Sequence, residues 1–297
     1  MLKRAYQPRH DQNRMRHEGN VALAREHYLS GRVPENLRRL LAGRYQWMNQ
    51  FIGENDVGLE VGCGTGLSKE FIRAKNYYLS DLDDYDWLDF KSVDALATPF
   101  DDASFDFVVN SNMIHHVASP LRFFAEMHRI LKPGGRLIIQ EINGSLLMRL
   151  LLRLMRHEGY SYDVDVFDPS AICTDPQDLW AANCVIPNLL FDDRKAFARH
   201  VSSFGMIHHR YRECLCLVNS GGVIAKTIYV PLPSAALRCL EAVDSVLTAW
   251  LPSLLALQRQ IVLQRLPVKA SLAEPRTEVV TAPAHRRPAN RSALAAG

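Results

Sequence analysis

Hydrophobic residues between positions 57 and 142 form short runs that alternate with helix-like stretches. Strands are predicted at 57–62, 76–81, 91–96, 105–111 and 135–142, with helices at 67–75 and 120–131. Strands separated by helical segments need crossover connections, which favour parallel pairing and place helices over the faces of the sheet. The pattern therefore predicts an α/β fold.

The pattern is less regular after residue 142, but two more strands are predicted, at 206–218 and 258–266. The segment between them, 234–251, is helical in pattern until Pro252 ends it. With the first five strands, these complete a doubly wound, mostly parallel, seven-stranded sheet with helices on both faces. Helical additions are expected after the fifth strand and between the last two strands.

The chain has 297 residues, which is enough for one elaborated domain. We expect a flexible basic N-terminus (1–17), cap helices (18–52), the main domain (53–266) and a disordered tail (267–297). Substrate-facing additions to the domain are expected at 143–205 and 234–257. The tail is rich in Ala, Pro, Thr and Arg, so it buries too little apolar surface to offset its ordering entropy.

Positive charge is concentrated at the two ends of the chain. Residues 1–20 and residues 267–297 each carry five Lys or Arg against two acidic residues, while the formal net charge of the whole chain is +3. Short basic ends are compatible with contact to phosphate or an anionic membrane, but they also simply aid solubility. Charge alone therefore selects no partner.

The sequence gives no sign of export or of a membrane span. No run of about 18 to 20 apolar residues occurs, and residues 1–25 lack the apolar core of a secretory signal. The six cysteines are too few and too irregularly spaced for a disulfide framework, and no CxxC pair suggests zinc. We therefore expect a cytoplasmic protein with free thiols.

The stretch LEVGCGTG (59–66) packs three glycines into five positions at the end of the first predicted strand. A glycine-rich first turn of a doubly wound sheet lets a ligand lie against bare backbone near a helix N-terminus. Dinucleotide-binding folds use G-x-G-x-x-G, whereas here Gly62, Gly64 and Gly66 are followed by Leu67. The spacing therefore favours a ligand other than a dinucleotide.

This stretch resembles motif I of the class I S-adenosylmethionine-dependent methyltransferases. VDALATPFDDASFDFVV (93–109) is similar to the segment between that family's third and fourth strands. MIHHV (113–117) and HRILKPGGRLII (128–139) resemble the segments that follow the fourth strand and precede the fifth in its type 11 branch. The resemblance covers roughly 55–142 and implies a Rossmann-like methyltransferase with S-adenosyl-L-methionine as cofactor.

The resemblance also implies which residues bind the cofactor. Asp81 would accept hydrogen bonds from both ribose hydroxyls, with Asp83 as the alternative. Asp94 and Ala95 would recognise the adenine, and Glu60 would orient the methionine end, unless it is a solvated strand-end acid. The expected cofactor-binding residues are Glu60, Gly62, Cys63, Gly64, Gly66, Asp81, Asp94, Ala95 and Asn110.

Methyl transfer from a sulfonium depends on alignment of the nucleophile, and a base helps when the acceptor is weakly acidic. The loop after the fourth strand carries His115 and His116 as candidate catalytic bases, although either could simply cap or line the following helix. The expected substrate-pocket residues are Ser111, Asn112, Glu141 and Asn143. No metal site is expected, because no ligand cluster is visible and adjacent histidines should project in different directions.

No nucleic-acid substrate is expected. The chain has NSNM where enzymes that methylate exocyclic amines of bases carry Asp/Asn-Pro-Pro-aromatic, and it lacks the Pro-Cys nucleophile of cytosine-C5 enzymes. The segment SLLMRLLLRLMR (145–156) combines eight apolar residues with Arg149, Arg153 and Arg156 at helical spacing. It is either an active-site lid or an interfacial helix that places the protein peripherally at the inner membrane surface.

We expect methyl transfer to a small-molecule acceptor, preferably an oxygen of a lipid-linked, glycan or other hydrophobic compound. The alternative is a non-catalytic module that uses the fold, and S-adenosylmethionine itself, to recruit a partner through residues 145–257. Intact cofactor residues favour the enzyme. The sequence indicates no oligomeric state.

Overall fold

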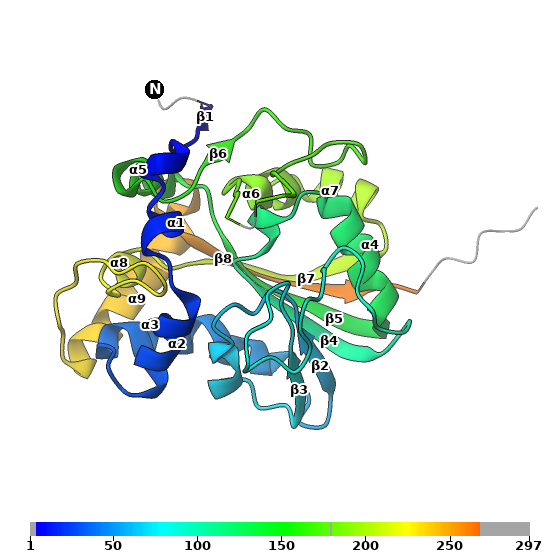
Figure 1. The fold of residues 1–297 in the computed structure, drawn as a ribbon, viewed down its shortest axis with the longest axis horizontal. Coiled ribbons are helices and arrows are strands. Elements are labelled where there is room, and N and C mark those ends of the chain that lie inside the picture. Colours follow the sequence, from blue (N-terminus) through cyan, green and yellow to red (C-terminus); the bar gives the residue numbers. More distant parts are fainter. Residues whose placement is uncertain (1–3, 179, 268–297) are drawn as a thin grey trace, which may run out of the picture. The chain divides into compact units, whose positions relative to one another are not determined.

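The structure is a computed structural model that describes residues 4–178 and 180–267 (Figure 1). A six-stranded sheet has the order β3-β2-β4-β5-β8-β7. Its strands are β2 (Val57–Glu60), β3 (Asn76–Leu79), β4 (Phe105–Ser111), β5 (Leu131–Ile142), β7 (Phe204–Arg212) and β8 (Gln258–Arg265). Strands β3, β2, β4 and β5 pair in parallel, and β8 is antiparallel to both its neighbours. The predicted doubly wound, mostly parallel α/β fold is confirmed.

Helices surround the sheet, and a small antiparallel sheet joins β1 (Ala5–Tyr6) to β6 (Tyr160–Ser161). The α-helices are α1 (Arg14–Glu18), α2 (Val21–Leu29), α3 (Glu35–Tyr45), α4 (Pro120–Ile130), α5 (Leu146–Met155), α6 (Ile186–Phe191), α7 (Arg194–His200), α8 (Leu215–Val218), α9 (Ser234–Trp250) and α10 (Pro252–Leu255). The 3-10 helices are η1 (His10–Gln12), η2 (Gln46–Gln50), η3 (Leu67–Glu70) and η4 (Ile114–His116).

Side chains alternate between the two faces of the sheet, as they must in strands. Val108 and Ile139 belong to one buried cluster, while Phe107, Val109 and Ile138 belong to the other. The first cluster includes side chains from α4, α6 and α7, and the second includes side chains from α2, α3 and η2. Figure 1 shows these two sets of helices on opposite sides of the sheet.

The sheet has six strands rather than the predicted seven, because residues 91–96 do not form a strand. Only an isolated bridge, Ser80 with Phe90, extends the edge of the sheet beyond β3. The Asp89 carboxylate accepts a hydrogen bond from the Leu79 backbone nitrogen at 2.8 Å. A side chain therefore satisfies a β3 donor that another strand would otherwise have paired.

The N-terminal segment, predicted to be flexible, contains ordered elements. β1 pairs with β6, and the Asn13 side chain caps α1 by accepting hydrogen bonds from Met15 N and Arg16 N. Arg14 N donates to the Arg156 carbonyl at 3.0 Å, just after α5. The segment is thus held by tertiary contacts with the insertion after β5, which its own polar sequence does not reveal.

The cap helices predicted at 18–52 correspond to α2, α3 and η2. Within residues 4–178 and 180–267, no helix is both long enough and apolar enough to cross a membrane. The tail predicted at 267–297 lies outside the described residues, apart from Pro267.

Candidate active site

A cavity of about 360 Å³ opens at the carboxyl ends of β2, β4 and β5. Residues that end or follow these strands line one side of it, including 62–65, Ser111, Asn112 and Ile142. The facing walls come from α1, α3, α5 and the segment 217–227. Their apolar contributions are Met15, Leu41, Met148, Leu151, Leu152, Met155, Leu217, Val223 and Ile224. The cavity is therefore polar beside the sheet and mostly apolar on the facing walls.

The glycine turn after β2 passes through three left-handed residues. Gly62, Gly64 and Gly66 have φ angles of 64°, 49° and 60°, a region that glycine enters without steric cost. A Cβ at Gly64 would meet no heavy atom within 4 Å, whereas one at Gly62 would lie 2.5 Å from Met113. Gly64, which lines the cavity, therefore presents bare backbone to it.

The helix predicted at 67–75 is only the 3-10 turn η3, which directly follows the glycine turn and contacts the end of β2 through Ser68. The hydroxyls of Ser68 and Tyr77 both donate to Glu60 Oε2, the latter at 2.9 Å. Glu60 Oε1 is buried without a hydrogen-bond partner. Burial raises the pKa of Glu60 to about 7. The notion of a solvated strand-end acid is therefore wrong.

Asn110, at the end of β4, is also fully buried, and neither polar atom of its side chain has a hydrogen-bond partner. Leaving one buried polar atom unpaired costs about 1–3 kcal/mol, so each such atom calls for a partner such as a ligand, an ion or a water molecule. Glu60 directly precedes the glycine turn after β2. Asn110 directly precedes Ser111, which lines the cavity. Together with the uncovered Gly64, they fit a polar ligand such as S-adenosylmethionine.

The other predicted cofactor residues lie around the same turn. Asp81 follows β3, and its carboxylate accepts hydrogen bonds from Gly64 N at 2.7 Å and Asp83 N at 3.2 Å. It therefore holds the glycine turn, and its contact with a ribose stays a prediction. Asp94 is exposed and Ala95 is half-buried, and neither lines the cavity. Their role in adenine recognition also stays a prediction.

The two histidines face one carboxylate. His115 Nδ1 lies 2.6 Å from Glu141 Oε1, and His116 Nδ1 lies 3.0 Å from the Ala181 carbonyl oxygen. Their Nε2 atoms lie 3.7 Å and 3.8 Å from the two oxygens of Glu158. The expectation that adjacent histidines project apart is wrong, since the ring centroids are 4.2 Å apart. The tight 3-10 turn η4 and the shared carboxylate hold both rings together.

The pKa values of the two histidines shift in opposite directions. Burial lowers the pKa of His115, but Glu141 and then Glu158 outweigh burial and raise that pKa above its ordinary value. Burial, followed by the neighbouring His115, lowers the pKa of His116 to about 4. His116 is therefore neutral at physiological pH. Because a carbonyl only accepts, Ala181 fixes the His116 proton on Nδ1 and leaves Nε2 as an acceptor.

The predicted substrate-pocket residues divide into two pairs. Ser111 and Asn112 line the cavity, whereas Glu141 and Asn143 do not. Glu141 is fully buried and also accepts hydrogen bonds from the backbone nitrogens of Met113 and Ile114, so it orients the histidine turn. Asn143 donates to the Pro252 and Ala256 carbonyls and fixes the start of the insertion. Both are positioning residues, not pocket residues.

Several cavity residues were missed by sequence reasoning. Glu158 and His157 follow α5, and Arg44 and Tyr45 end α3. Glu158 lies more than 40 positions after His115 and His116 in the sequence, and the fold brings these residues together. No short sequence motif therefore indicates that Glu158 belongs to the site. A partial signal for Arg44 was available, since an arginine is unusual on the apolar face of a helix.

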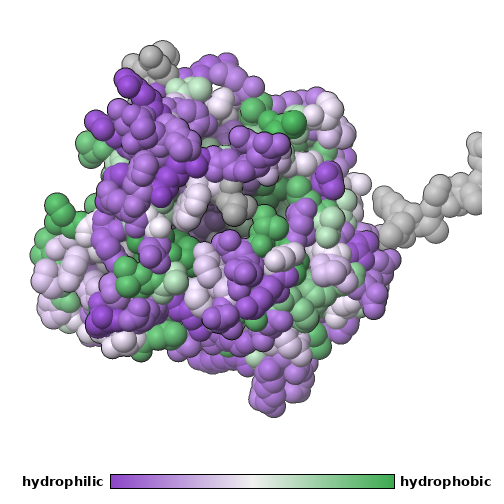
Figure 2. Space-filling view, viewed as in Figure 1, coloured by the Kyte–Doolittle hydropathy of each residue, from purple (hydrophilic) through white to green (hydrophobic). Residues whose placement is uncertain are grey.

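Helix α5 is confirmed as a helix, but its faces differ from those predicted. Arg149 lies over the ring of Tyr162, and Arg153 lies over the rings of Tyr6 and Tyr160. Cation–π contacts thus turn two of the three arginines towards the protein. The exposed ridge consists of Leu146, Leu150 and Leu154, the last 81% exposed. In Figure 2, hydrophobic residues gather over α5 and over the loop between α8 and α9.

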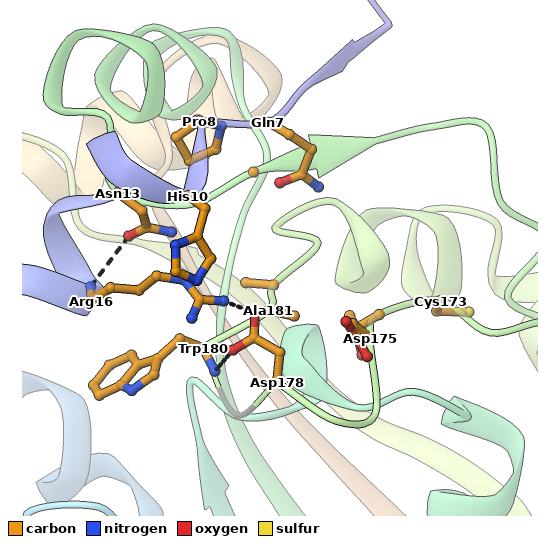
Figure 3. A pocket seen from close by; sticks show the side chains of 13 residues that line it. Gln7, Pro8, His10, Asn13, Arg16, Cys173, Asp175, Asp178, Trp180 and Ala181 are labelled. Carbon is orange, nitrogen blue, oxygen red and sulfur yellow. Dashed lines mark hydrogen bonds and ion pairs between the residues drawn. The ribbon is translucent and has the colours of Figure 1, made fainter.

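A smaller pocket of about 270 Å³ lies between the N-terminal segment and residues 173–182 (Figure 3). Arg16 forms an ion pair with Asp178 across it, and Asp178 also accepts a hydrogen bond from Trp180 N. Trp180 lines both this pocket and the main cavity. The ion pair therefore fastens α1 over the edge of the cavity.

Residues 59–139 match the protein family described as "Methyltransferase domain". The matched range begins in β2, contains the glycine turn and the histidine pair, and ends in β5. Residues 59–139 therefore form a methyltransferase domain. The match covers strands β2 to β5, whose carboxyl ends line one side of the cavity, while the walls from α1, α3, α5 and 217–227 lie outside it.

Similar proteins include three methyltransferases with named acceptors. Demethylmenaquinone methyltransferase of Clavibacter sepedonicus is 32% identical over 99 residues, covering 29% of this chain and 40% of that protein. The chloroplastic 2-phytyl-1,4-beta-naphthoquinone methyltransferase of Arabidopsis thaliana is 39% identical over 142 residues, covering 38% and 54%. The 27-O-demethylrifamycin SV methyltransferase of Amycolatopsis mediterranei is 33% identical over 101 residues, covering 27% and 36%. This chain spans about half or less of each relative.

Proposed function

We propose that this protein transfers a methyl group from S-adenosylmethionine to a hydroxyl oxygen of a hydrophobic small molecule. The observation that carries the proposal is a single cavity into which both the bare backbone of Gly64 and the His115–His116–Glu158 cluster open. S-adenosylmethionine supplies an electrophilic methyl carbon. The chain's own residues would hold that cofactor at the glycine turn and hold the acceptor against it.

The character of the walls supports a hydrophobic acceptor. Leucine and methionine side chains of α5 and valine and isoleucine at 223–224 face the cavity. The named relatives act on naphthoquinones and on a rifamycin, which are large and mostly apolar. A hydroxyl needs help to lose its proton, and the histidine cluster lines the cavity. Oxygen is therefore the proposed acceptor atom.

Two measurements test this function in sequence. Calorimetry with S-adenosylmethionine determines whether the cofactor binds one to one. Incubation with a panel of phenols, hydroquinones and lipid-linked alcohols is then followed by mass spectrometry for the gain of one methyl group. A methylated product supports the enzyme, whereas tight cofactor binding without any product across the panel favours the partner-recruiting module.

Cofactor binding is expected to release protons near neutral pH. Glu60 has a pKa of about 7 in the free protein, so about half of the molecules carry its proton at that pH. A positively charged ligand beside Glu60 favours the carboxylate and lowers this pKa. Binding at pH 7 should therefore release about half a proton, and affinity should rise as pH increases through 7. Calorimetry in buffers of different ionisation enthalpy measures the release.

The Glu60→Gln variant supplies the control, because glutamine keeps the shape and cannot ionise. Its binding should be weaker and should release no proton at this pH. Equal proton release by wild type and Glu60→Gln would assign the proton to another group.

We also propose that α5 contacts an anionic membrane surface from which a hydrophobic acceptor could enter. The leucine ridge lies beside α10, which adds the exposed Leu254, and Arg156 is exposed at the end of α5. One face of α5 lines the cavity while the ridge faces solvent. Interfacial helices usually bind a membrane by burying apolar side chains among the lipids while nearby basic side chains attract anionic headgroups.

Replacing Leu150 and Leu154 together by serine should weaken vesicle binding by about 2 kcal/mol, from the lost burial of two side chains. Co-sedimentation with vesicles containing phosphatidylserine measures it. Leu29→Ser, at a 50% exposed leucine of α2, is the matched control and should bind like the wild type. Wild-type protein that stays in the supernatant at low salt would remove the membrane proposal.

A further inference from the structure

We propose that His115, His116 and Glu158 form a binding site for one divalent transition-metal ion. The three side chains come from η4 and from the segment after α5. One ligand atom from each lies within 4.8 Å of the others. His115 and Glu158 are buried, while His116 is partly open to the cavity. The matched residues 59–139 include both histidines but not Glu158, which lies in the segment after α5.

Both imidazoles are already oriented as metal ligands. The Glu141 carboxylate holds His115 Nδ1, and the Ala181 carbonyl holds His116 Nδ1. Histidines that bind metals almost always donate their other ring N–H to a carboxylate or a backbone carbonyl. Each such bond leaves the Nε2 lone pair for the ion. Here both Nε2 atoms face Glu158.

The charges around the cluster suit a cation. Glu141 and Glu158 are two buried carboxylates. Glu158 is approached by His115, His116 and His157, and its Oε2 lies 3.3 Å from Cys184 Sγ. Among residues 4–178 and 180–267, no lysine or arginine forms an ion pair with either carboxylate. A bound cation would therefore neutralise charge that only histidines now offset.

Two imidazole nitrogens and one carboxylate select the kind of metal. Mg²⁺ and Ca²⁺ prefer oxygen ligands, whereas Zn²⁺, Fe²⁺ and Co²⁺ accept this set and leave positions open for water or substrate. Two ligands at about 2.1 Å from a tetrahedral ion lie about 3.4 Å apart. The chosen atoms, one from each of the three side chains, lie within 4.8 Å of one another, so no separation has to close by more than about 1.4 Å.

The role of the ion rests on the proposed function. A hydroxyl of the acceptor on an open coordination position would lose its proton to water, because a bound metal lowers the pKa of an oxygen ligand. The resulting alkoxide or phenolate forms the new O–C bond, and the pair of the broken C–S bond stays on sulfur. His116 would then act as a ligand and not as a free base.

Metal binding is tested without cofactor or acceptor, on the untagged full chain treated with EDTA and dialysed. Titration with Zn²⁺ by calorimetry, and with Co²⁺ by visible absorption, should show one site per chain. Glu158→Gln and His116→Ala should each weaken binding at least about 100-fold, and Glu141→Gln about 10–100-fold. His17→Ala, at an exposed histidine of α1, controls for surface binding and should leave affinity unchanged.

Thermal unfolding and S-adenosylmethionine affinity are measured on every variant, so that a folding defect is recognised. Glu158→Gln keeps the size of the side chain and should remain folded. Absence of stoichiometric binding by the wild type, or undiminished binding by folded Glu158→Gln, would overturn the site. Because cofactor binding is measured separately, failure of the metal site and failure of the proposed methyl transfer give different results.

Discussion

Gly64→Val is expected to weaken S-adenosylmethionine binding at least about 100-fold, or about 2.8 kcal/mol. Gly64 lines the cavity with its Cα, and a Cβ built there meets no atom within 4 Å. The branched side chain would therefore fill space that the backbone turn leaves for the ligand. It would also force a β-branched residue to a φ of 49°. Calorimetry with the cofactor measures the loss.

Backbone strain alone would also disturb the turn, and the chain offers a matched control for it. Gly134 has a φ of 77°, is exposed, and likewise has no atom within 4 Å of an added Cβ. It lies in β5 outside the cavity lining. Gly134→Val should therefore lose a similar stability, about 1–2 kcal/mol, without losing affinity. Equal loss of binding by both variants, or retained affinity in Gly64→Val, would contradict a ligand seated on bare backbone.

Much of the fold could be predicted because its signals are local. The alternation that places Val108 and Phe107 on opposite faces is visible in the sequence, as is the glycine turn. The strand wrongly predicted at 91–96 shows the limit of such signals. Its residues have a suitable pattern, but the Asp89 side chain already satisfies the Leu79 donor at the edge of β3. A short apolar run cannot indicate whether a neighbouring side chain competes with it.

The site could be predicted only in part, and for the same reason. Motif spacing located the glycine turn and the histidine pair, both within one continuous stretch. Glu158 joins the histidines through the fold, and its ordinary sequence context gives no warning. The faces of α5 were misjudged because helical spacing places arginines together but does not show that tyrosines receive them. Tertiary partners, rather than periodicity, decide these features.

Arg44→Met is expected to lower the free energy of unfolding by about 3–5 kcal/mol. Arg44, in α3, lines the cavity and donates two hydrogen bonds of 2.8 Å to the Glu213 carboxylate, which follows β7. The side chains are only 7% and 10% exposed. Removing the guanidinium leaves a buried carboxylate without its counter-charge, which costs far more than the lost contact itself. Denaturant unfolding measures the change.

The same helix carries a second arginine–glutamate pair that has the same hydrogen-bond lengths but is more exposed, and it serves as the control. Arg39 also donates two hydrogen bonds of 2.8 Å, to Glu241, but these side chains are 26% and 41% exposed. Arg39→Met should therefore cost only about 0–1 kcal/mol, because water replaces the lost partner. The difference between the two variants isolates burial as the cause. Equal losses of stability in the two variants would show that burial of the Arg44–Glu213 ion pair does not stabilise the contact between α3 and the sheet. The cavity wall at α3 would then depend on apolar packing.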